Sequence, residues 1–206
     1  MAETRKVPDI VVGRLPLYLR TLEFLQQEGI TVTSSTDLGA RLNISAAQIR
    51  KDLSHFGEFG KQGMGYHVGF LHDQLRSILH LDREWETALV GAGDLGHALV
   101  HYDELLGQGF RIACVFDNDP GKIGTILRGL EIHHVRTLPE VVSSLGIRIG
   151  IVAVPVEQAQ SVVDSLVGAG AKAILNYAPI TVTVPEDVQV QYIDPVAHLQ
   201  HMTYYL

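Results

Sequence analysis

The first 80 residues carry hydrophobic positions at the spacing of short amphipathic helices. In residues 14–29 leucines recur every three or four positions up to a glycine, which predicts one helix. Pro16 lies inside this pattern, so the helix either begins near Pro16 or is kinked there. Residues 34–42 predict a second, shorter helix with Ser34 or Ser35 as its N-cap.

A third helix is predicted in residues 45–57, after a turn at Asn43. Ser45 followed by Gln48 is a capping-box signature, and positions 49, 53 and 56 form an apolar face. The opposite face suits a recognition helix, because small residues allow close approach to a groove and polar ones contact bases and phosphates. The residues expected to face DNA are Ala46, Gln48, Arg50, Lys51 and Ser54. A merely solvent-exposed face is the alternative.

Residues 56–69 are rich in glycine and aromatic residues, which predicts a twisted hairpin with Lys61 near its tip. A basic hairpin directly after a recognition helix is a wing that can contact phosphates or the minor groove. A structural glycine-rich loop is the alternative. Helix-turn-helix and wing in this order predict a winged-helix DNA-binding domain over residues 1–82.

Beyond a charged stretch at residues 80–86 the pattern changes to apolar strands that alternate with helices. The predicted strands lie in 86–91, 110–117, 130–135, 148–155, 172–177 and 181–194, and the helices begin at Leu95, near 138 and at Val156. Such alternation predicts a doubly wound, mostly parallel α/β sheet of the Rossmann type with helices on both faces. We assign it residues 83–193.

Residues 89–96, LVGAGDLG, join the first of these strands to a helix with the glycine spacing of a dinucleotide-binding turn. Gly91 makes the tight turn, Gly93 lets a pyrophosphate approach, and Gly96 lets the helix pack on the strand. The next strand ends at Asp117, where a carboxylate accepts hydrogen bonds from the adenosine ribose and repels a 2′-phosphate. The sequence therefore predicts NAD(H) rather than NADP(H), although Lys122 lies nearby. The expected contacts include the intervening Ala92, Asp94 and Leu95, and, at later strand ends, Val154, Pro155 and Asn176.

No catalytic or metal site is predicted. A dehydrogenase needs a general acid or base and an orienting Arg or Lys at the carboxyl ends of the later strands, and the sequence offers neither there. His97 and His101 have a possible metal spacing but no third ligand. An NAD-dependent oxidoreductase and a CoA- or nucleotide-binding interaction module remain alternatives, and both explain only the second half of the chain.

Composition changes this picture in one respect. The formal net charge is −7, but residues 1–80 carry a net charge of +1 and the remainder a net charge of −8. Because DNA affinity depends on the charge presented locally to phosphates, the near-neutral N-terminal part is compatible with DNA binding.

The single cysteine, Cys114, lies in an apolar strand and is expected to be buried. Neither a signal pattern nor a membrane-length apolar run is visible, so we expect a cytoplasmic protein without membrane contact.

The sequence resembles the Rex family of redox-sensing transcriptional repressors. The matching elements run through nearly the whole chain in the order VPDIVVGRLPLYLRTL, SAAQIRKDLSHFGEFGKQGMGY, LVGAGDLGHAL, FDNDPGKIG and ILNYAP. The resemblance implies a homodimer whose subunits join a winged helix to a Rossmann domain. It also implies NADH as the effector: the repressor binds palindromic operator DNA when NADH is scarce and releases it as NADH accumulates.

The resemblance also implies roles for individual residues. Arg50, Lys51 and Ser54 fall where the family's recognition helix meets DNA, and Lys61 falls in its wing. Tyr102 matches a tyrosine close to the nicotinamide; Arg20 and Asp194 match a polar pair that exchanges partners with it between redox states. Residues 194–206 match a C-terminal helix exchanged between subunits; here it is expected to be short, and Pro195 stands where some members have an aromatic residue.

Overall fold

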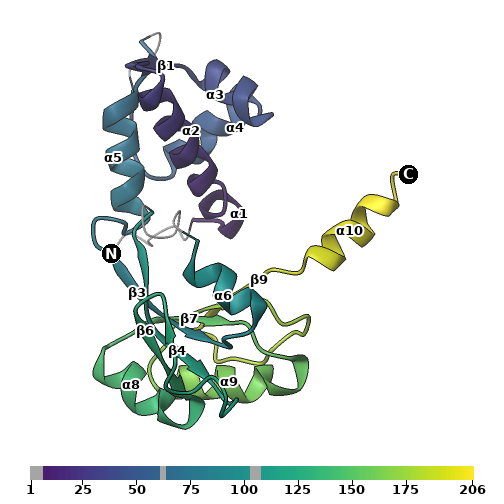
Figure 1. The fold of residues 1–206 in the computed structure, drawn as a ribbon. Coiled ribbons are helices and arrows are strands. Elements are labelled where there is room, and N and C mark those ends of the chain that lie inside the picture. Colours follow the sequence, from purple (N-terminus) through teal and green to yellow (C-terminus); the bar gives the residue numbers. More distant parts are fainter. Residues whose placement is uncertain (1–6, 61–63, 103–107) are drawn as a thin grey trace. The chain divides into compact units, whose positions relative to one another are not determined.

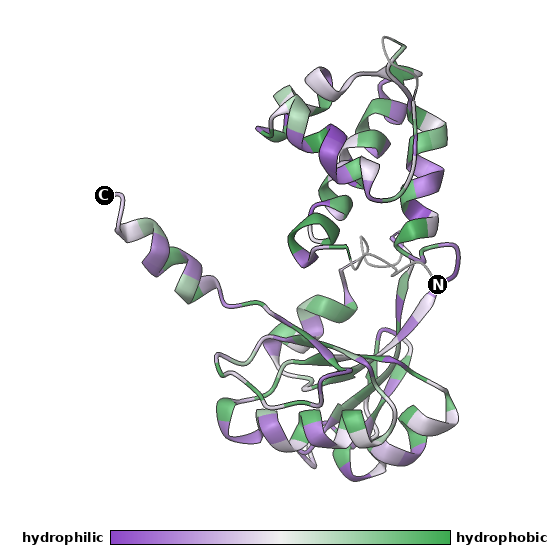
Figure 2. Ribbon diagram, turned by 180° about the vertical axis from the view of Figure 1, so that it is seen from behind, coloured by the Kyte–Doolittle hydropathy of each residue, from purple (hydrophilic) through white to green (hydrophobic). Residues whose placement is uncertain are grey.

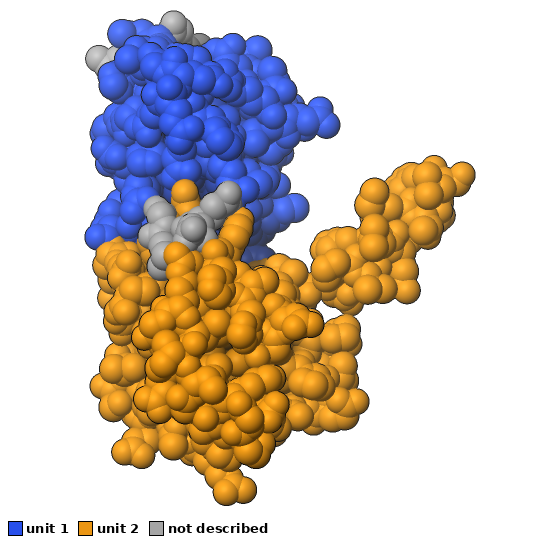
Figure 3. All heavy atoms as spheres, in the orientation of Figure 1, with its two compact units in different colours: residues 1–82 blue, residues 83–206 orange. Residues whose placement is uncertain are grey.

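The structure is a computed structural model that describes residues 7–60, 64–102 and 108–206. Its chain divides into two compact units, residues 1–82 and residues 83–206 (Figure 3). Unit 1 contains α1 (Asp9–Val12), α2 (Leu15–Gln27), β1 (Val32–Thr33), α3 (Ser35–Leu42), α4 (Ala46–Ser54), β2 (Tyr66–His67) and α5 (Val68–Ile78) (Figure 1). The sequence pattern did not lead us to expect α5, which packs against α2.

The predicted first helix is α2, and its start explains Pro16. The helix begins at Leu15, so Pro16 occupies its first turn, where a missing N–H costs no helical hydrogen bond. The four leucines at positions 15, 19, 22 and 25 are buried. Gly29, two residues beyond the helix, has φ +75°, a conformation that favours glycine.

Helices α3 and α4 form the predicted helix-turn-helix pair. Ser34 caps α3 in a complete capping box with Asp37, and Asn43 makes the turn with φ 55°. Ser45 caps α4 by accepting a hydrogen bond from the Gln48 backbone N–H at 3.2 Å. A full capping box would also need the Gln48 side chain to accept from the Ser45 backbone N–H. That part of the prediction was wrong, because the Gln48 side chain donates to Asp52 instead.

The predicted hairpin in residues 56–69 differs from the observed pairing. Among the described residues, the strand of this segment is β2, and it pairs antiparallel with β1, which precedes α3. Gly65 allows this pairing, because a Cβ there would lie 2.4 Å from the Thr33 carbonyl oxygen. Lys61 lies outside the described residues.

Unit 2 contains a seven-stranded sheet in the order β5-β6-β4-β3-β7-β8-β9. Its elements are β3 (Trp85–Val90), α6 (Asp94–Val100), β4 (Phe110–Asp117), β5 (Ile126–Leu127), β6 (Leu130–His134), a 3-10 helix (Val135–Thr137), α8 (Leu138–Ser144), β7 (Ile149–Val152), α9 (Val156–Gly168), β8 (Ala173–Asn176), β9 (Gln189–Tyr192) and α10 (Pro195–Thr203). All pairings are parallel except that of β5 with β6. Without β5 this is the Rossmann strand order, which confirms the predicted fold class.

Both faces of the sheet are covered. Helices α8 and α9 pack on one face and α6 on the other (Figure 1). Cys114 lies buried on the α8–α9 face, and burial raises the pKa of its thiol to about 12. The strand predicted across 181–194 is shorter than expected, since only Gln189–Tyr192 pairs with β8. No helix among the described residues is long and apolar enough to cross a membrane.

The last helix, α10, has no buried residue. Hydrophobic and hydrophilic residues alternate along it (Figure 2). Val196, Leu199 and Met202 follow one another at three-residue spacing and are about 60% exposed (61%, 60% and 60%). An amphipathic helix that leaves these side chains in solvent has an apolar stripe available for another surface.

Candidate cofactor cleft and DNA-facing surface

The glycine turn lies where the strand order of unit 2 reverses, between β3 and β7. This is the position at which open α/β sheets bind ligands. Gly91 has φ +103°, and a Cβ there would lie 2.2 Å from the Ala153 carbonyl oxygen. A Cβ at Gly96 would lie 2.0 Å from the Gly91 carbonyl oxygen, so helix and turn pack backbone to backbone. A Cβ at Gly93 would meet nothing within 4 Å. Two glycines therefore close the turn, and the third leaves open space above it.

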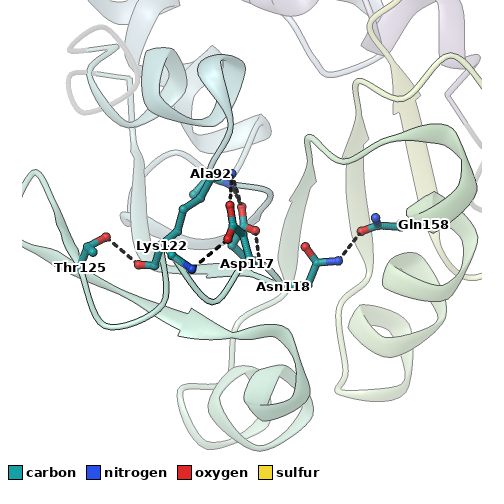
Figure 4. Close-up of polar contacts among 8 residues, drawn as sticks. Ala92, Asp117, Asn118, Lys122, Thr125 and Gln158 are labelled. Carbon is teal, nitrogen blue, oxygen red and sulfur yellow. Dashed lines mark hydrogen bonds and ion pairs between the residues drawn. The ribbon is translucent and has the colours of Figure 1, made fainter.

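Asp117 is held directly against this turn (Figure 4). Its Oδ2 accepts a hydrogen bond from the Ala92 backbone N–H at 2.7 Å, and its Oδ1 accepts one from the Asp119 N–H at 2.9 Å. The Lys122 ammonium lies 3.2 Å from Oδ2. Burial alone would raise the pKa of the Asp117 carboxyl, but these donors outweigh burial and lower it. The carboxylate is therefore ionised at neutral pH and fixed relative to the turn.

A cleft of about 720 Å³ opens beside the turn. From the predicted set it is lined by Gly91, Gly93, Asp117, Val154 and Pro155. The lining also contains polar residues that were not predicted from the sequence, among them Asp119, Arg136 and Gln158. Gln158 accepts a hydrogen bond from the Asn118 side chain at 3.2 Å, which links the end of β4 to α9 (Figure 4). Arg136 follows β6, and it reaches the cleft because β6 pairs with β4 in the sheet. The sequence pattern alone does not give this strand order, so it could not identify Arg136 as a lining residue.

Asn176 differs from its prediction as a cofactor contact. Its side chain is fully buried and does not line the cleft. The Nδ2 group donates to the carbonyls of Ala178 and Ile180 at 3.1 and 3.0 Å, and Oδ1 accepts from the Ala178 N–H at 3.0 Å. Asn176 therefore holds the loop that follows β8, because buried amide groups need such partners.

Other predicted cofactor residues also lie apart from the cleft lining. Tyr102 lines a separate hollow of about 190 Å³ with Arg111 and Arg128. Asp194 caps α10 by accepting hydrogen bonds from two backbone N–H groups, at 3.0 and 3.1 Å. Arg20 is exposed on α2, in the other unit. Their expected roles near the nicotinamide stay predictions.

In the glycine turn itself, Ala92 is buried, and Asp94 and Leu95 are exposed at the start of α6.

In unit 1, α4 presents the predicted DNA-facing side chains to solvent. Arg50, Lys51 and Ser54 are exposed, and Ala46 and Gln48 are half-buried at the helix start. Arg50 donates to the Ser35 hydroxyl at 2.8 Å, which links α4 to the start of α3. A hollow of about 910 Å³ lies beside these groups, between α3, α4 and the segment leading to β2; its lining includes Ser35, Arg50, Ser54 and Tyr66.

The sequence reasoning missed a buried ionic network behind this surface. Asp52, on the inner face of α4, is fully buried and binds Arg14, Tyr18 and Gln48. An aspartate beside Ile49 and Leu53 on an otherwise apolar face was the available signal, because a buried carboxylate needs a partner. No group of three or more His, Cys, Asp or Glu side chains that could hold a metal occurs in the described part of the chain.

Two family models match the chain. "Putative DNA-binding protein N-terminus" matches residues 6–54, and "CoA binding domain" matches residues 82–180. Among curated proteins, a redox-sensing transcriptional repressor Rex of Roseiflexus sp. (strain RS-1) is 52% identical over 100% of this chain and 94% of its own. The Rex protein of Brevibacillus brevis is 46% identical over the full length of both chains.

Among solved structures, RSP, a Rex-family repressor, resembles this protein in two complexes. With β-NAD⁺ and operator DNA it has a TM-score of 0.92 and 38% identity, covering 97% of this chain and 92% of its own. With β-NADH the TM-score is 0.88 and the identity 36%, covering 97% and 94%. Fold and sites thus define a winged-helix unit joined to a Rossmann-type nucleotide-binding unit. Within that class, the chain belongs to the Rex family of redox-sensing transcriptional repressors.

Proposed function

We propose that this protein binds palindromic operator DNA through unit 1 and NAD(H) through unit 2, and that NADH releases it from the operator. Transcription of the controlled genes then follows the NADH/NAD⁺ ratio. The observation that carries the proposal is the presence, in one chain, of a glycine turn closed onto Asp117 and a helix-turn-helix with exposed Arg50 and Lys51. The operator and NADH complexes of RSP support it. Because its target is operator DNA, we place its action in the cytoplasm.

The residues of the cleft fit NAD(H). Open space above Gly93 suits a pyrophosphate that approaches the backbone, and the start of α6 provides N–H groups and a positive dipole end. The ionised Asp117 suits a ribose with both hydroxyls free and opposes a 2′-phosphate. Lys122 and Arg136 also line the cleft, and their positive charges would weaken the repulsion of a 2′-phosphate without removing it.

A homodimer is part of the proposal. The exposed apolar stripe of α10, formed by Val196, Leu199 and Met202, would pack on a second copy, with residues 194–206 as an exchanged segment separate from the Rossmann domain 83–193. Two-fold symmetry would present two copies of α4 to the two halves of a palindrome. NADH would change the angle between the copies so that the recognition helices no longer match both half-sites.

We further propose that the cofactor is bound without turnover. The titratable side chains that line the cleft, Asp117, Asp119, Lys122 and Arg136, lie at strand ends beside the glycine turn, where we place the adenosine half. Tyr102, Arg20 and Asp194 would tell NADH from NAD⁺, which differ at the nicotinamide by one charge and by ring planarity. A preparation that oxidises NADH catalytically, with any small carbonyl substrate, would contradict this part.

A CoA-binding role is the second candidate, because the "CoA binding domain" model covers residues 82–180. The ribose of CoA carries a 3′-phosphate, and an ionised Asp117 would repel a phosphate placed beside it. We therefore expect CoA to compete with NADH only weakly. If NADH fluorescence shows that equimolar CoA displaces NADH, this result would favour a CoA-binding role instead.

The proposal is tested with labelled DNA. A palindromic duplex is first selected by the protein from a randomised pool, and its binding is followed by fluorescence anisotropy while NADH or NAD⁺ is added. We expect NADH to release the duplex at concentrations at which NAD⁺ does not. A protein that selects no duplex, or whose complex responds equally to both forms, does not act as proposed.

A further inference from the structure

The recognition helix α4 carries a fully buried carboxylate. Asp52 lies on its inner face between Ile49 and Leu53, with 0% of its surface exposed. An ionised group in such a position is stable only when its oxygens are well paired, and removal of one partner leaves a buried charge. The position of α4 and the partners of Asp52 are therefore coupled.

Two of the partners come from α2 and the residue before it. The Arg14 guanidinium binds Asp52 with both ends, at 2.6 Å from Nε and 2.8 Å from Nη2. The Tyr18 hydroxyl donates to Oδ2 at 2.6 Å. Burial alone would raise the pKa of the Asp52 carboxyl, but the donors outweigh it and lower that pKa. A bidentate guanidinium fixes direction as well as distance, so α4 is held at one angle to α2.

The third partner lies on the DNA-facing side of the network. Gln48, one turn before Asp52 on α4, donates from Nε2 to Asp52 Oδ1 at 2.7 Å. A carboxylate can only accept, so this contact decides which end of the Gln48 amide is Nε2. Among the described residues, neither Oε1 nor the second N–H of the amide has a hydrogen-bond partner, and together they form the pair with which glutamine reads an adenine edge.

We propose that Asp52 is a positioning residue for operator recognition. Arg14 and Tyr18 fix the orientation of its carboxylate, and the carboxylate fixes the orientation of the Gln48 amide toward the bases. The inference rests on the proposed function, since it assigns a task to α4 as a recognition helix. It goes further by locating part of the sequence specificity in residues that do not touch DNA. Preorganised contacts of this kind bind more selectively than mobile ones.

The test uses the full-length protein and the duplex that the wild-type protein selects from a random pool. In Asp52→Asn we expect affinity for this duplex to fall about tenfold, the size of one poorly read base pair. Affinity for a scrambled duplex should change less than about twofold, because phosphate contacts remain. In a Gln48→Ala background, Asp52→Asn should have no further effect on discrimination among single-base variants of the duplex.

Controls separate positioning from stability. Glu28→Gln breaks an exposed bidentate ion pair with Arg41 in the same unit and should leave discrimination unchanged. If circular dichroism shows that Asp52→Asn does not fold, Tyr18→Phe replaces it, because this variant keeps the ion pair and removes one hydrogen bond. It should lose discrimination in the same direction.

The outcomes are distinguishable. A folded Asp52→Asn or Tyr18→Phe protein with wild-type discrimination, or equal losses with and without Gln48, overturns the inference and leaves the proposed function intact. A wild-type protein that selects no duplex overturns the proposed function itself.

Discussion

The two units each place one buried aspartate at the centre of a functional element, but they hold it differently. Asp52 in unit 1 binds three side chains, two of which come from 34 and 38 residues earlier in the chain. Asp117 in unit 2 binds the backbone of its own strand end and of the adjacent glycine turn, besides Lys122. Asp52 is enclosed within the protein, whereas Asp117 lines an open cleft.

The difference separates two ways of building a site. Backbone donors are present whatever side chains surround them, so the Asp117 site depends mainly on glycines that let the chain approach closely. The Asp52 site depends on side chains that must each be correct, so single substitutions should alter its specificity. Three substitutions and one change of pH test this difference.

The largest effect is expected for Gly91→Ala. The new Cβ would lie 2.2 Å from the Ala153 carbonyl oxygen at φ +103°, which should destabilise unit 2 by about 3 kcal/mol or more and abolish NADH binding. Operator binding, if it remains, should no longer respond to NADH. Gly168→Ala is the control, since a Cβ there meets nothing within 4 Å and φ is not positive. Thermal unfolding and NADH fluorescence check both, and NADH affinity that survives Gly91→Ala contradicts the turn assignment.

Asp117→Asn should weaken NADH binding by about 2 to 3 kcal/mol, because it removes the charged acceptor that we propose for the ribose hydroxyls and disturbs the Ala92 contact. NADPH should lose less, so the preference for NADH should shrink. Isothermal titration of both nucleotides measures the change. Asp187→Asn, which breaks an exposed ion pair with Lys172 in the same unit, should change neither affinity.

Arg50→Ala should reduce operator affinity by about 2 kcal/mol and lower its dependence on salt, while NADH affinity stays unchanged. Arg41→Ala removes an arginine from α3 of the same unit and is the matched control. Equal losses in the two variants would show that overall charge, rather than the α4 surface, decides DNA binding.

The smallest effect is on the acid stability of unit 1. Asp52 has a folded pKa below its unfolded value of about 3.9, so its contribution to stability is present above that pH and disappears as pH falls through the folded pKa. The protection factors of the α4 amides, in which hydrogen exchange is corrected for its intrinsic pH dependence, should therefore fall on acidification more in the wild-type protein than in Asp52→Asn. Identical pH dependence in both would mean that Asp52 is not stabilised by its ion pair.

Local motifs explain which features the sequence could predict. Gly91, Gly96 and Asp117 act through spacing along one β-α-β segment, so their geometry follows from a pattern within 27 residues. Ser34 and Asn43 were also predictable, because caps and turns involve near neighbours. The full Asp52 network could not be predicted, since two of its partners, Arg14 and Tyr18, lie 38 and 34 residues earlier in the chain. The position of Asn176 outside the cleft lining has a related cause: whether a polar residue at a strand end faces the cleft or its own loop depends on packing.

We propose that unit 2 senses the redox state of a dinucleotide and that unit 1 responds by binding or releasing DNA. The most direct test measures occupancy of the selected duplex while the NADH/NAD⁺ ratio varies at a constant total concentration of the two nucleotides. We predict that occupancy falls as the ratio rises, and that it stays constant in Gly91→Ala. Occupancy that is independent of the ratio in the wild-type protein, with both nucleotides saturating, would contradict the claim.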